Sequence, residues 1–287
     1  MKSLRFWLTA SFLPWLALQI GVGRAEPAWV GFPLGVALAA GLVVAVTVMH
    51  NEWGERQWMR SLRSAPTACG LLLAMAAWCV AGGLVPPGCE AAWVEAIGLE
   101  EFTTAWPFLW LIVLLLVHLQ LVLLHRLKSR GWRRSIPFLL VHGGVWLALG
   151  AGFVGSSDLE DWRTAVGRDE PTRTAYDRQG HQHPLPYSLR LRHFEVQRAE
   201  TDGSVVQFRA DVEVDEQPAR LAVNAPYRRA WNEDLYLLSY DTHSPEPQYC
   251  IVQIVREGDK PFLWLGIVCL MVGVVWQVLT SKRLTNP

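Results

Sequence analysis

Apolar runs of about 20 residues alternate with short polar loops over most of the chain. Six such runs lie at about residues 6–22, 28–49, 67–86, 105–125, 134–154 and 261–280. About 20 apolar residues suffice to cross a bilayer as a helix, and a backbone in hydrocarbon must satisfy its own hydrogen bonds. The pattern therefore predicts an integral membrane protein with about six transmembrane helices.

One block, residues 155–260, follows a different pattern. It opens with a charged stretch and continues with short segments in which apolar and polar residues alternate. These segments lie at 188–196, 205–214, 219–223, 235–240 and 249–255. Alternation with a period of two indicates half-buried strands. We therefore expect one mainly antiparallel β domain, tethered to the membrane at both ends.

The loop charges predict the orientation. The loops at 50–66 and 125–134 are rich in arginine and lysine, whereas the segment 87–104 carries four glutamates and no lysine or arginine. Positively charged loops stay in the cytoplasm. Both chain termini would then lie inside, and the β domain would lie on the periplasmic, outer side of a bacterial inner membrane. The formal net charge of zero gives no reason to expect a nucleic-acid partner.

Composition agrees with a membrane location. The chain is 51% hydrophobic and only 18% charged, and it contains 15 tryptophans. Trp53, Trp132, Trp162 and Trp264 stand at the edges of apolar runs, which is the pattern of an aromatic belt in contact with membrane lipid.

The first apolar run has two interpretations. It begins with basic residues and ends at the sequence Gly-Arg-Ala of residues 23–25, which resembles the end of a secretory signal peptide. It can equally be a retained first helix. The remaining helices have the same topology in both cases.

Cysteine and histidine patterns leave two further alternatives open. No two of the five cysteines form a C-x-x-C motif, but Cys89 and Cys250 both fall on the expected oxidising side, where a disulfide could join them. His181 and His183 are either solvated loop residues or a metal-binding pair without an evident third ligand. No motif of a known catalytic site is present, so nothing indicates an enzyme that acts alone.

Five short motifs occur in the order in which they occur in one known family. They are GLVP at 83–86, FLLVHG at 138–143, LPYSLRLRHF at 185–194, VNAP at 223–226 with LYLLSY at 235–240, and VRE at 255–257. From about residue 67 to its end, the chain resembles the ResB (CcsB) family of cytochrome c biogenesis proteins. The two first apolar runs are extra to the family pattern, and the β domain is short for it.

The resemblance implies an organisation and a role. Residues 1–50 would be an extra hydrophobic hairpin, 67–154 a three-helix core, 155–260 the periplasmic β domain and 261–280 a last transmembrane helix. Family members act in system II cytochrome c assembly with a ResC/CcsA-type membrane protein, and together the two deliver haem and attach it to apocytochrome c. The partner's Trp-rich motif is missing from this sequence, so the partner would be a separate polypeptide.

Two histidines within the apolar runs are the candidate ligands of haem b. His142 and His118 lie at similar depths from the same membrane face on consecutive helices, and imidazole is a common ligand of haem iron. The neighbouring Gly143 and Gly144 would allow another helix or a flat ligand to approach closely. The resemblance supports His142 but not His118. Either His142 shares a haem with the partner protein, or His142 and His118 bind one haem within this chain.

Other interpretations remain. His142 could form only a structural hydrogen bond to a neighbouring helix. His125, beside Arg126, is expected to be a polar helix end at the interface. The whole chain could be a scaffold that holds apocytochrome or the partner without binding haem. A membrane sensor or transporter is a third class, although the runs contain no paired carboxylates and no inverted repeat.

Overall fold

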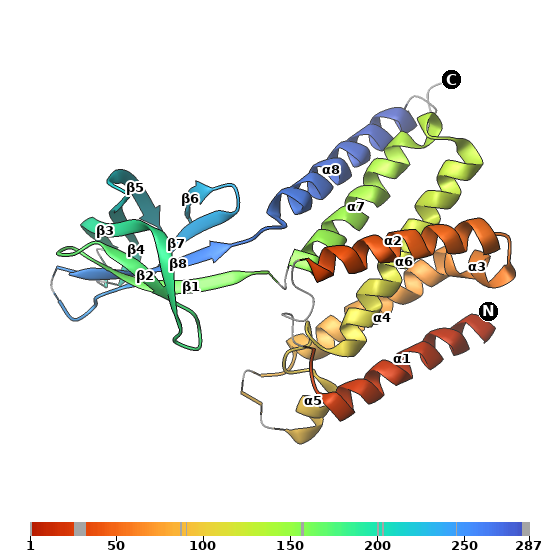
Figure 1. Ribbon diagram of the computed structural model, residues 1–287, viewed down its shortest axis with the longest axis horizontal. Helices are drawn as coiled ribbons and strands as arrows, with labels where there is room; N and C mark the ends of the chain where they lie inside the picture. The colour runs from red at the N-terminus through yellow and green to blue at the C-terminus, as the bar shows by residue number, and fades with distance from the viewer. Residues whose placement is uncertain are drawn as a thin grey trace. The chain divides into compact units, whose positions relative to one another are not determined.

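The computed structural model consists of two compact units (Figure 1). A helical unit comprises residues 1–158 and 262–287, and a β unit comprises residues 159–261. The structure describes residues 2–25, 33–86, 88–89, 91–155, 158–199, 201–202, 204–244 and 246–282, with side chains from residue 12 to residue 280.

The helical unit contains the predicted apolar helices. Its helices are α1 (Lys2–Val22), α2 (Leu34–Trp53), α3 (Gln57–Leu62), α4 (Ala65–Gly83), α5 (Ala92–Ile97), α6 (Trp106–Arg130), α7 (Ile136–Gly155) and α8 (Lys260–Lys282). Within the described residues, five helices are long and apolar enough to cross a membrane, namely α2, α4, α6, α7 with the turn before it, and α8. The segment Phe12–Val22 of α1 is apolar but shorter. The expected helical membrane protein is confirmed.

Helix α6 is the centre of this unit. Half of its apolar window is buried within the protein, compared with 11 to 17% for the other four spans. Three neighbouring helices reach it through hydrogen bonds. The backbone N–H of Trp106 donates to Gln19 Oε1 of α1 over 3.1 Å, and Gln120 Nε2 donates to the Val43 carbonyl of α2 over 2.8 Å. Trp146 Nε1 of α7 donates to the Leu116 carbonyl over 3.1 Å.

Helices α7 and α8 approach each other through glycines. A Cβ atom added at Gly144 of α7 would lie 2.6 Å from the Gly266 carbonyl oxygen, and one added at Gly266 of α8 would lie 2.7 Å from the Gly144 oxygen. A Cβ atom added at Gly273, two turns further along α8, would lie 2.8 Å from side-chain atoms of Leu140 and Val141. Small residues at such positions allow two backbones within a membrane to come into van der Waals contact.

The β unit is a single antiparallel sheet. Its strands are β1 (Glu160–Gly167), β2 (Thr172–Tyr176), β3 (Gln182–Arg198), β4 (Val205–Val214), β5 (Gln217–Ala222), β6 (Tyr227–Ala230), β7 (Glu233–Tyr240) and β8 (Tyr249–Arg256). They pair in the order β5-β4-β3-β2-β1-β8-β7-β6. Ala222 and Ala225 pair in a tight turn between β5 and β6, and one face of the sheet buries a single apolar core.

The five predicted strands are present, but three others were missed. The stretch after residue 158 was read as polar, yet β1 buries Trp162, Thr164 and Val166 on alternate positions. The alternation is hidden in the sequence because the buried Thr164 is polar and the exposed Ala165 is apolar. Trp162 was expected in an aromatic belt. It is 9% exposed and belongs to the core of the β unit, whereas Trp53 and Trp264 are exposed, as a belt requires.

The glycine contact between α7 and α8 is testable with a matched pair of variants. Gly144→Ala should destabilise the purified protein by about 1–3 kcal/mol, because its new methyl group overlaps the α8 backbone. Gly152→Ala, on the same helix, has nothing within 4 Å of the added atom and should be neutral or slightly stabilising. Thermal unfolding in mild detergent measures both, and equal melting temperatures would contradict the close approach.

Candidate functional site

His142 of α7 is half-buried and has a fixed orientation. Its Nδ1 lies 3.2 Å from the carbonyl oxygen of Phe138, one turn earlier on the same helix. Its ring stacks on that of Phe138, with 3.9 Å between the centroids. A carbonyl can only accept a hydrogen bond, so Nδ1 carries the proton. Nε2 of the neutral ring therefore keeps its lone pair.

His118 of α6 also binds a backbone carbonyl through Nδ1, but this carbonyl belongs to another helix. Its Nδ1 lies 2.6 Å from the carbonyl oxygen of Leu62 in α3, and its side chain is nearly enclosed. Again Nδ1 must donate, and Nε2 is the nitrogen with the free lone pair. Histidines that bind a metal through one ring nitrogen usually donate a hydrogen bond from the other, often to a backbone carbonyl.

The contacts between α6 and α7 bring the two histidines to similar depths. Trp146 bonds to Leu116, and the guanidinium of Arg126 lies 5.0 Å from the centroid of the Phe138 ring. His142, midway between Phe138 and Trp146, is therefore level with the middle of the segment 116–126. His118 lies about one helical turn from this level, within electrostatic range of His142. Among the described residues, no direct contact joins the two rings.

The two glycines beside His142 have different environments. Gly143 has nothing within 4 Å of an added Cβ atom, whereas Gly144 is packed against α8. Gly144 thus allows the close approach of a neighbouring helix, and Gly143 leaves open space of the kind that a flat ligand needs.

A second pair of histidines was missed in the sequence. His50, at the end of α2, is 3% exposed, and its ring lies edge-on to that of His125 in α6, with 6.3 Å between the centroids. His125 was expected to be an isolated polar helix end. The sequence alone could not pair these two residues, because 74 residues separate them and only the parallel packing of α2 against α6 joins them.

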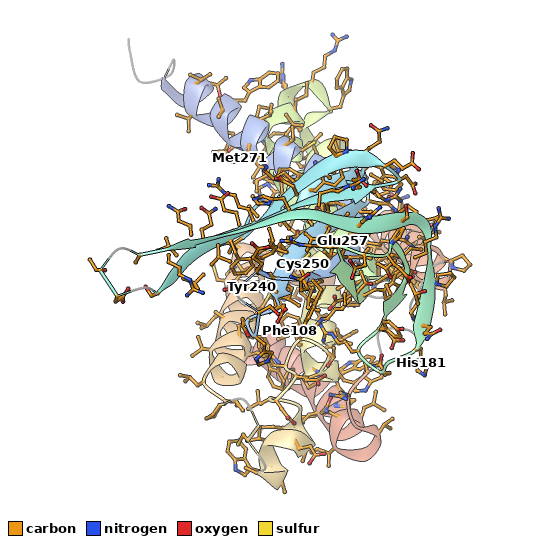
Figure 2. The ribbon with its side chains drawn as sticks, turned by 90° about the vertical axis from the view of Figure 1, so that its left-hand side faces the viewer. Phe108, His181, Tyr240, Cys250, Glu257 and Met271 are labelled. Carbon is orange, nitrogen blue, oxygen red and sulfur yellow. The ribbon has the colours of Figure 1, made fainter. Side chains whose placement is uncertain are left out.

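His181 and His183 both bind the side chain of Asp177 in the hairpin between β2 and β3. One carboxylate oxygen of Asp177 accepts hydrogen bonds from His181 Nδ1 at 3.0 Å and His183 Nε2 at 3.2 Å. Loss of hydration raises the pKa of Asp177, but the hydrogen bonds from His183 and His181 outweigh it and hold this pKa well below its usual range. Figure 2 shows His181 in this hairpin. In the part of the chain that the structure describes, no group of three or more His, Cys, Asp or Glu residues could hold a metal ion.

A buried charged cluster lies where β6, β7 and β8 meet. Glu233 is 1% exposed and forms ion pairs with Arg229 and Arg256. The Arg229 guanidinium lies 4.2 Å from the centroid of the Tyr187 ring, and that of Arg256 lies 4.5 Å from the Trp162 ring. Such stacking adds to the ion pairs because the aromatic faces carry partial negative charge.

These contacts set the pKa values in the cluster. Burial opposes ionisation of Glu233, but hydrogen bonds from Arg229 and Arg256 outweigh it and lower its pKa. Burial and the neighbouring Glu233 carboxylate raise the pKa of Tyr187, whose enclosed hydroxyl makes no hydrogen bond of normal geometry. Each charge thus has a protein partner, which is the property of a structural network.

Cys250 belongs to the core of the β unit (Figure 2). It is fully buried in β8, and burial raises the pKa of its thiol to about 12. Cys89 and Cys250 are both free, so the alternative of a disulfide between them is not realised.

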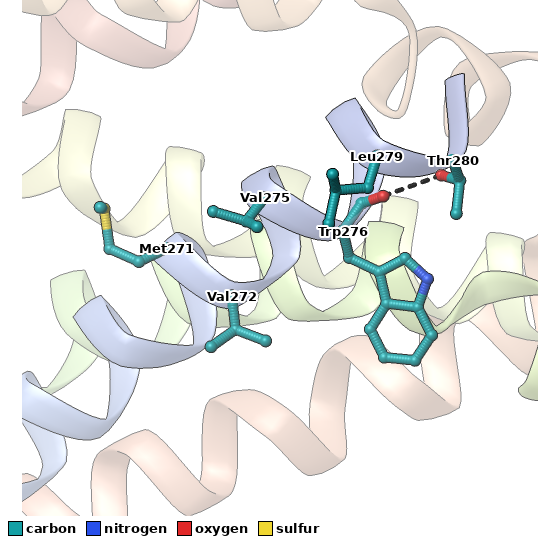
Figure 3. A pocket seen from close by; sticks show the side chains of 6 residues that line it. All are labelled: Met271, Val272, Val275, Trp276, Leu279 and Thr280. Carbon is teal, nitrogen blue, oxygen red and sulfur yellow. Dashed lines mark hydrogen bonds between the residues drawn. The ribbon is translucent and has the colours of Figure 1, made fainter. Parts of the chain in front are cut away.

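The outer face of α8 is apolar and open. Figure 3 shows Met271, Val275 and Trp276 on this one helix, with the Thr280 hydroxyl bonded to the Trp276 carbonyl over 2.9 Å. Side chains from a single helix cannot enclose a ligand. This face is suited to contact with lipid.

Residues 129–249 match the profile of the ResB-like family. This segment of the chain belongs to the ResB-like family. The match includes His142 and most of the β unit, and it confirms the resemblance found in the sequence. It supports a role in cytochrome c biogenesis. The helices α1 to α5 and most of α6, with His50, His118 and His125, precede the ResB-like segment.

Comparison with other proteins adds little to the ResB-like assignment. None of the curated proteins compared with the chain matches it. Among solved structures, cytochrome c haem lyase CcmF is similar at 15% identity and a TM-score of 0.37, over 74% of this chain. The chain spans 34% of the length of that structure, and so distant a likeness carries no argument.

The charged cluster predicts how the β unit responds to acid. The folded pKa of Glu233 is below its unfolded value, so its contribution is complete above about pH 4.3 and is lost as the pH falls through the folded pKa. Glu233→Gln should therefore cost about 3–5 kcal/mol at pH 7 and make the loss on acidification smaller than in the parent protein.

Protease resistance of the β unit in urea, measured on the purified full chain at pH 7 and in steps downward from about pH 4.3, follows this effect. The control is Glu160→Gln, because Glu160 is exposed and lies 3.4 Å from Arg256. This surface pair should contribute about 0–1 kcal/mol. Equal effects of the two substitutions would contradict the structural role of the buried carboxylate.

Proposed function

We propose that the chain is a haem-handling membrane subunit of cytochrome c assembly, which works with a separate ResC/CcsA-type protein to deliver haem to apocytochrome c. The proposal rests on the hydrogen bonding of two imidazoles that lie within apolar helices. Both His142 and His118 bind a backbone carbonyl through Nδ1, and both keep Nε2 available as a ligand. The ResB-like assignment of residues 129–249 supports the same conclusion.

The residues fit a haem iron by their chemistry. Neutral imidazole nitrogens are common axial ligands of haem, and a hydrogen bond from the opposite ring nitrogen orients the ligand and increases its basicity. The stack of His142 on Phe138 fixes the ring plane, and Gly143 leaves open space beside it. When bound, haem is the cargo that the assembly complex joins to cytochrome thiols. This chain binds, orients and shields it.

Two forms of the haem site are distinguishable. In one, His142 supplies one ligand and the partner protein supplies the other. In the other, His142 and His118 act together, since they lie at similar depths on α7 and α6. The ring of His118 points towards α3, where its Nδ1 binds Leu62, and the ring of His142 lies against Phe138 of its own helix. Because the two rings are held in different places, we favour the form in which the partner protein supplies the second ligand.

A scaffold without haem is the second candidate function. Its support comes from the β unit, where the buried charges of the Glu233 cluster are paired with one another. Such a rigid unit is suited to hold a partner or an extended apocytochrome. On either proposal, the β unit lies on the periplasmic side of a bacterial inner membrane, because the arginine-rich loops flank the opposite ends of the helices.

Haem binding is tested by co-expressing the chain with a ResC/CcsA-type protein and purifying the pair in mild detergent. His142→Ala should abolish low-spin haem or convert it to a high-spin form, and added imidazole should restore the low-spin spectrum. His118→Ala should have the same effect only if both ligands come from this chain. His193→Ala, at an exposed position of β3, is the control. A pair that binds no haem, or binds it unchanged in both variants, would support the scaffold instead.

The orientation is tested by single cysteines placed at Asn224 and Arg130 in a variant with its five native cysteines replaced. A membrane-impermeant maleimide should label the cysteine at 224 in intact cells whose outer membrane is permeabilised. It should label the cysteine at 130 only after the inner membrane is opened. Labelling of both from the same side would contradict the proposed topology.

A further inference from the structure

An open cleft of about 310 Å³ lies where α2 ends and α3 begins, and it is lined by Trp53, Arg56 and Trp58. The centroids of the two indole rings are 6.4 Å apart, and the ring planes are inclined by 45°. Both side chains are nearly half exposed, Trp53 at 45% and Trp58 at 46%. Two large aromatic side chains left open beside a cation are typical of a surface that contacts something outside the protein.

The turn that forms this cleft is fixed from beneath. The backbone N–H of Arg56 donates to the Trp53 carbonyl over 2.9 Å, and Nη1 of Arg63 donates to the Gly54 carbonyl over 2.9 Å. Met59, next to Trp58 in α3, is fully buried in the helical unit. These contacts hold the two indoles and the guanidinium in place, so the cleft is formed before anything binds in it.

The charge of Arg56 has no partner within the protein. Arg56 and Arg60 are both exposed, and among the described residues no carboxylate forms an ion pair with either. The two loops at this end of the helices, residues 50–66 and 125–135, together carry eight arginines and lysines. They carry only two acidic residues, Glu52 and Glu55, which leaves a formal excess of six positive charges. An anion from outside the chain can supply the missing counter-charge.

The position of the cleft selects the kind of anion. The apolar span of α2 ends at Trp53, so the cleft lies at the depth of the lipid headgroups, where indole rings are favoured. A guanidinium group matches the oxygens of a phosphate with two parallel hydrogen bonds. The apolar faces of the indoles can pack against the glycerol and the first acyl carbons of a lipid. Free phosphate would gain nothing from these aromatic walls.

We propose that Trp53, Arg56 and Trp58 bind the headgroup of one anionic phospholipid. The Arg56 guanidinium binds the phosphate, and the two indoles lie on either side of the glycerol. The preference for an anionic lipid follows from the excess of positive charge at this end, and anionic lipids attract such basic segments. The site lies outside the ResB-like segment and does not depend on haem. It gives the turn between α2 and α3 a defined depth in the membrane.

The experiment is native mass spectrometry of the purified full chain in mild detergent, titrated with phosphatidylglycerol or with phosphatidylcholine of the same acyl chains. The parent protein should bind one phosphatidylglycerol saturably and several-fold more tightly than phosphatidylcholine. Arg56→Gln should weaken this binding about tenfold, because a charge-assisted hydrogen bond to the phosphate is lost. Trp58→Ala should weaken it about fivefold. Arg56→Lys, which keeps the charge but not the planar fork, should lie between Arg56→Gln and the parent.

Arg133→Gln is the matched control. Arg133 lies at the same end of the helices, 5.5 Å from the centroid of the exposed Trp132 ring, but it does not line the cleft. Its substitution removes the same charge and should leave the tight binding of one lipid in place. Equal weakening by Arg133→Gln and Arg56→Gln would show attraction by net charge alone and would overturn the site. Equal binding of the two lipids, or displacement of the lipid by equimolar inorganic phosphate, would overturn it as well.

Discussion

A polar group inside an apolar helix bundle must find its partner in the protein, because hydrocarbon offers none. This constraint explains how the helical unit is assembled. Gln19 accepts a hydrogen bond from the backbone of α6, Gln120 donates to α2, and Trp146 donates to α6. Each bond joins two helices that apolar contact alone would hold only loosely. The same rule makes an unpaired imidazole conspicuous, and it separates His50 from the other membrane histidines.

The β unit solves a different problem. Its stability depends on burying one face of a sheet, and that face forms a single apolar core. The buried charges do not contradict this logic. Glu233 is enclosed with two arginines, and the aromatic rings of Tyr187 and Trp162 cover their guanidinium groups. The cluster fixes the register of β7 and β8 at the point where the chain leaves the sheet.

Sequence reasoning succeeded where one physical signal dominated. Twenty apolar residues have few alternatives to a membrane helix, and the strand β4 agrees with its predicted bounds because its alternation is regular. It failed where two signals overlapped. In β1 the buried Thr164 is polar and the exposed Ala165 is apolar, which concealed the strand, and Trp162 at the edge of an apolar run looked like a belt residue. The pairing of Arg256 with Glu233 could not be predicted, because it depends on strand register rather than on local pattern.

The same distinction applies to the histidines. A histidine in the middle of an apolar run is conspicuous in the sequence, so His142 and His118 were singled out. His50, near the end of its run, was indistinguishable from a polar helix end. Its significance depends on burial, which α3 and α6 provide by packing with α2 around Val46, Met59 and Leu121. Because α6 bonds to both α1 and α2, the N-terminal hairpin is part of the same bundle as the ResB-like helix α7.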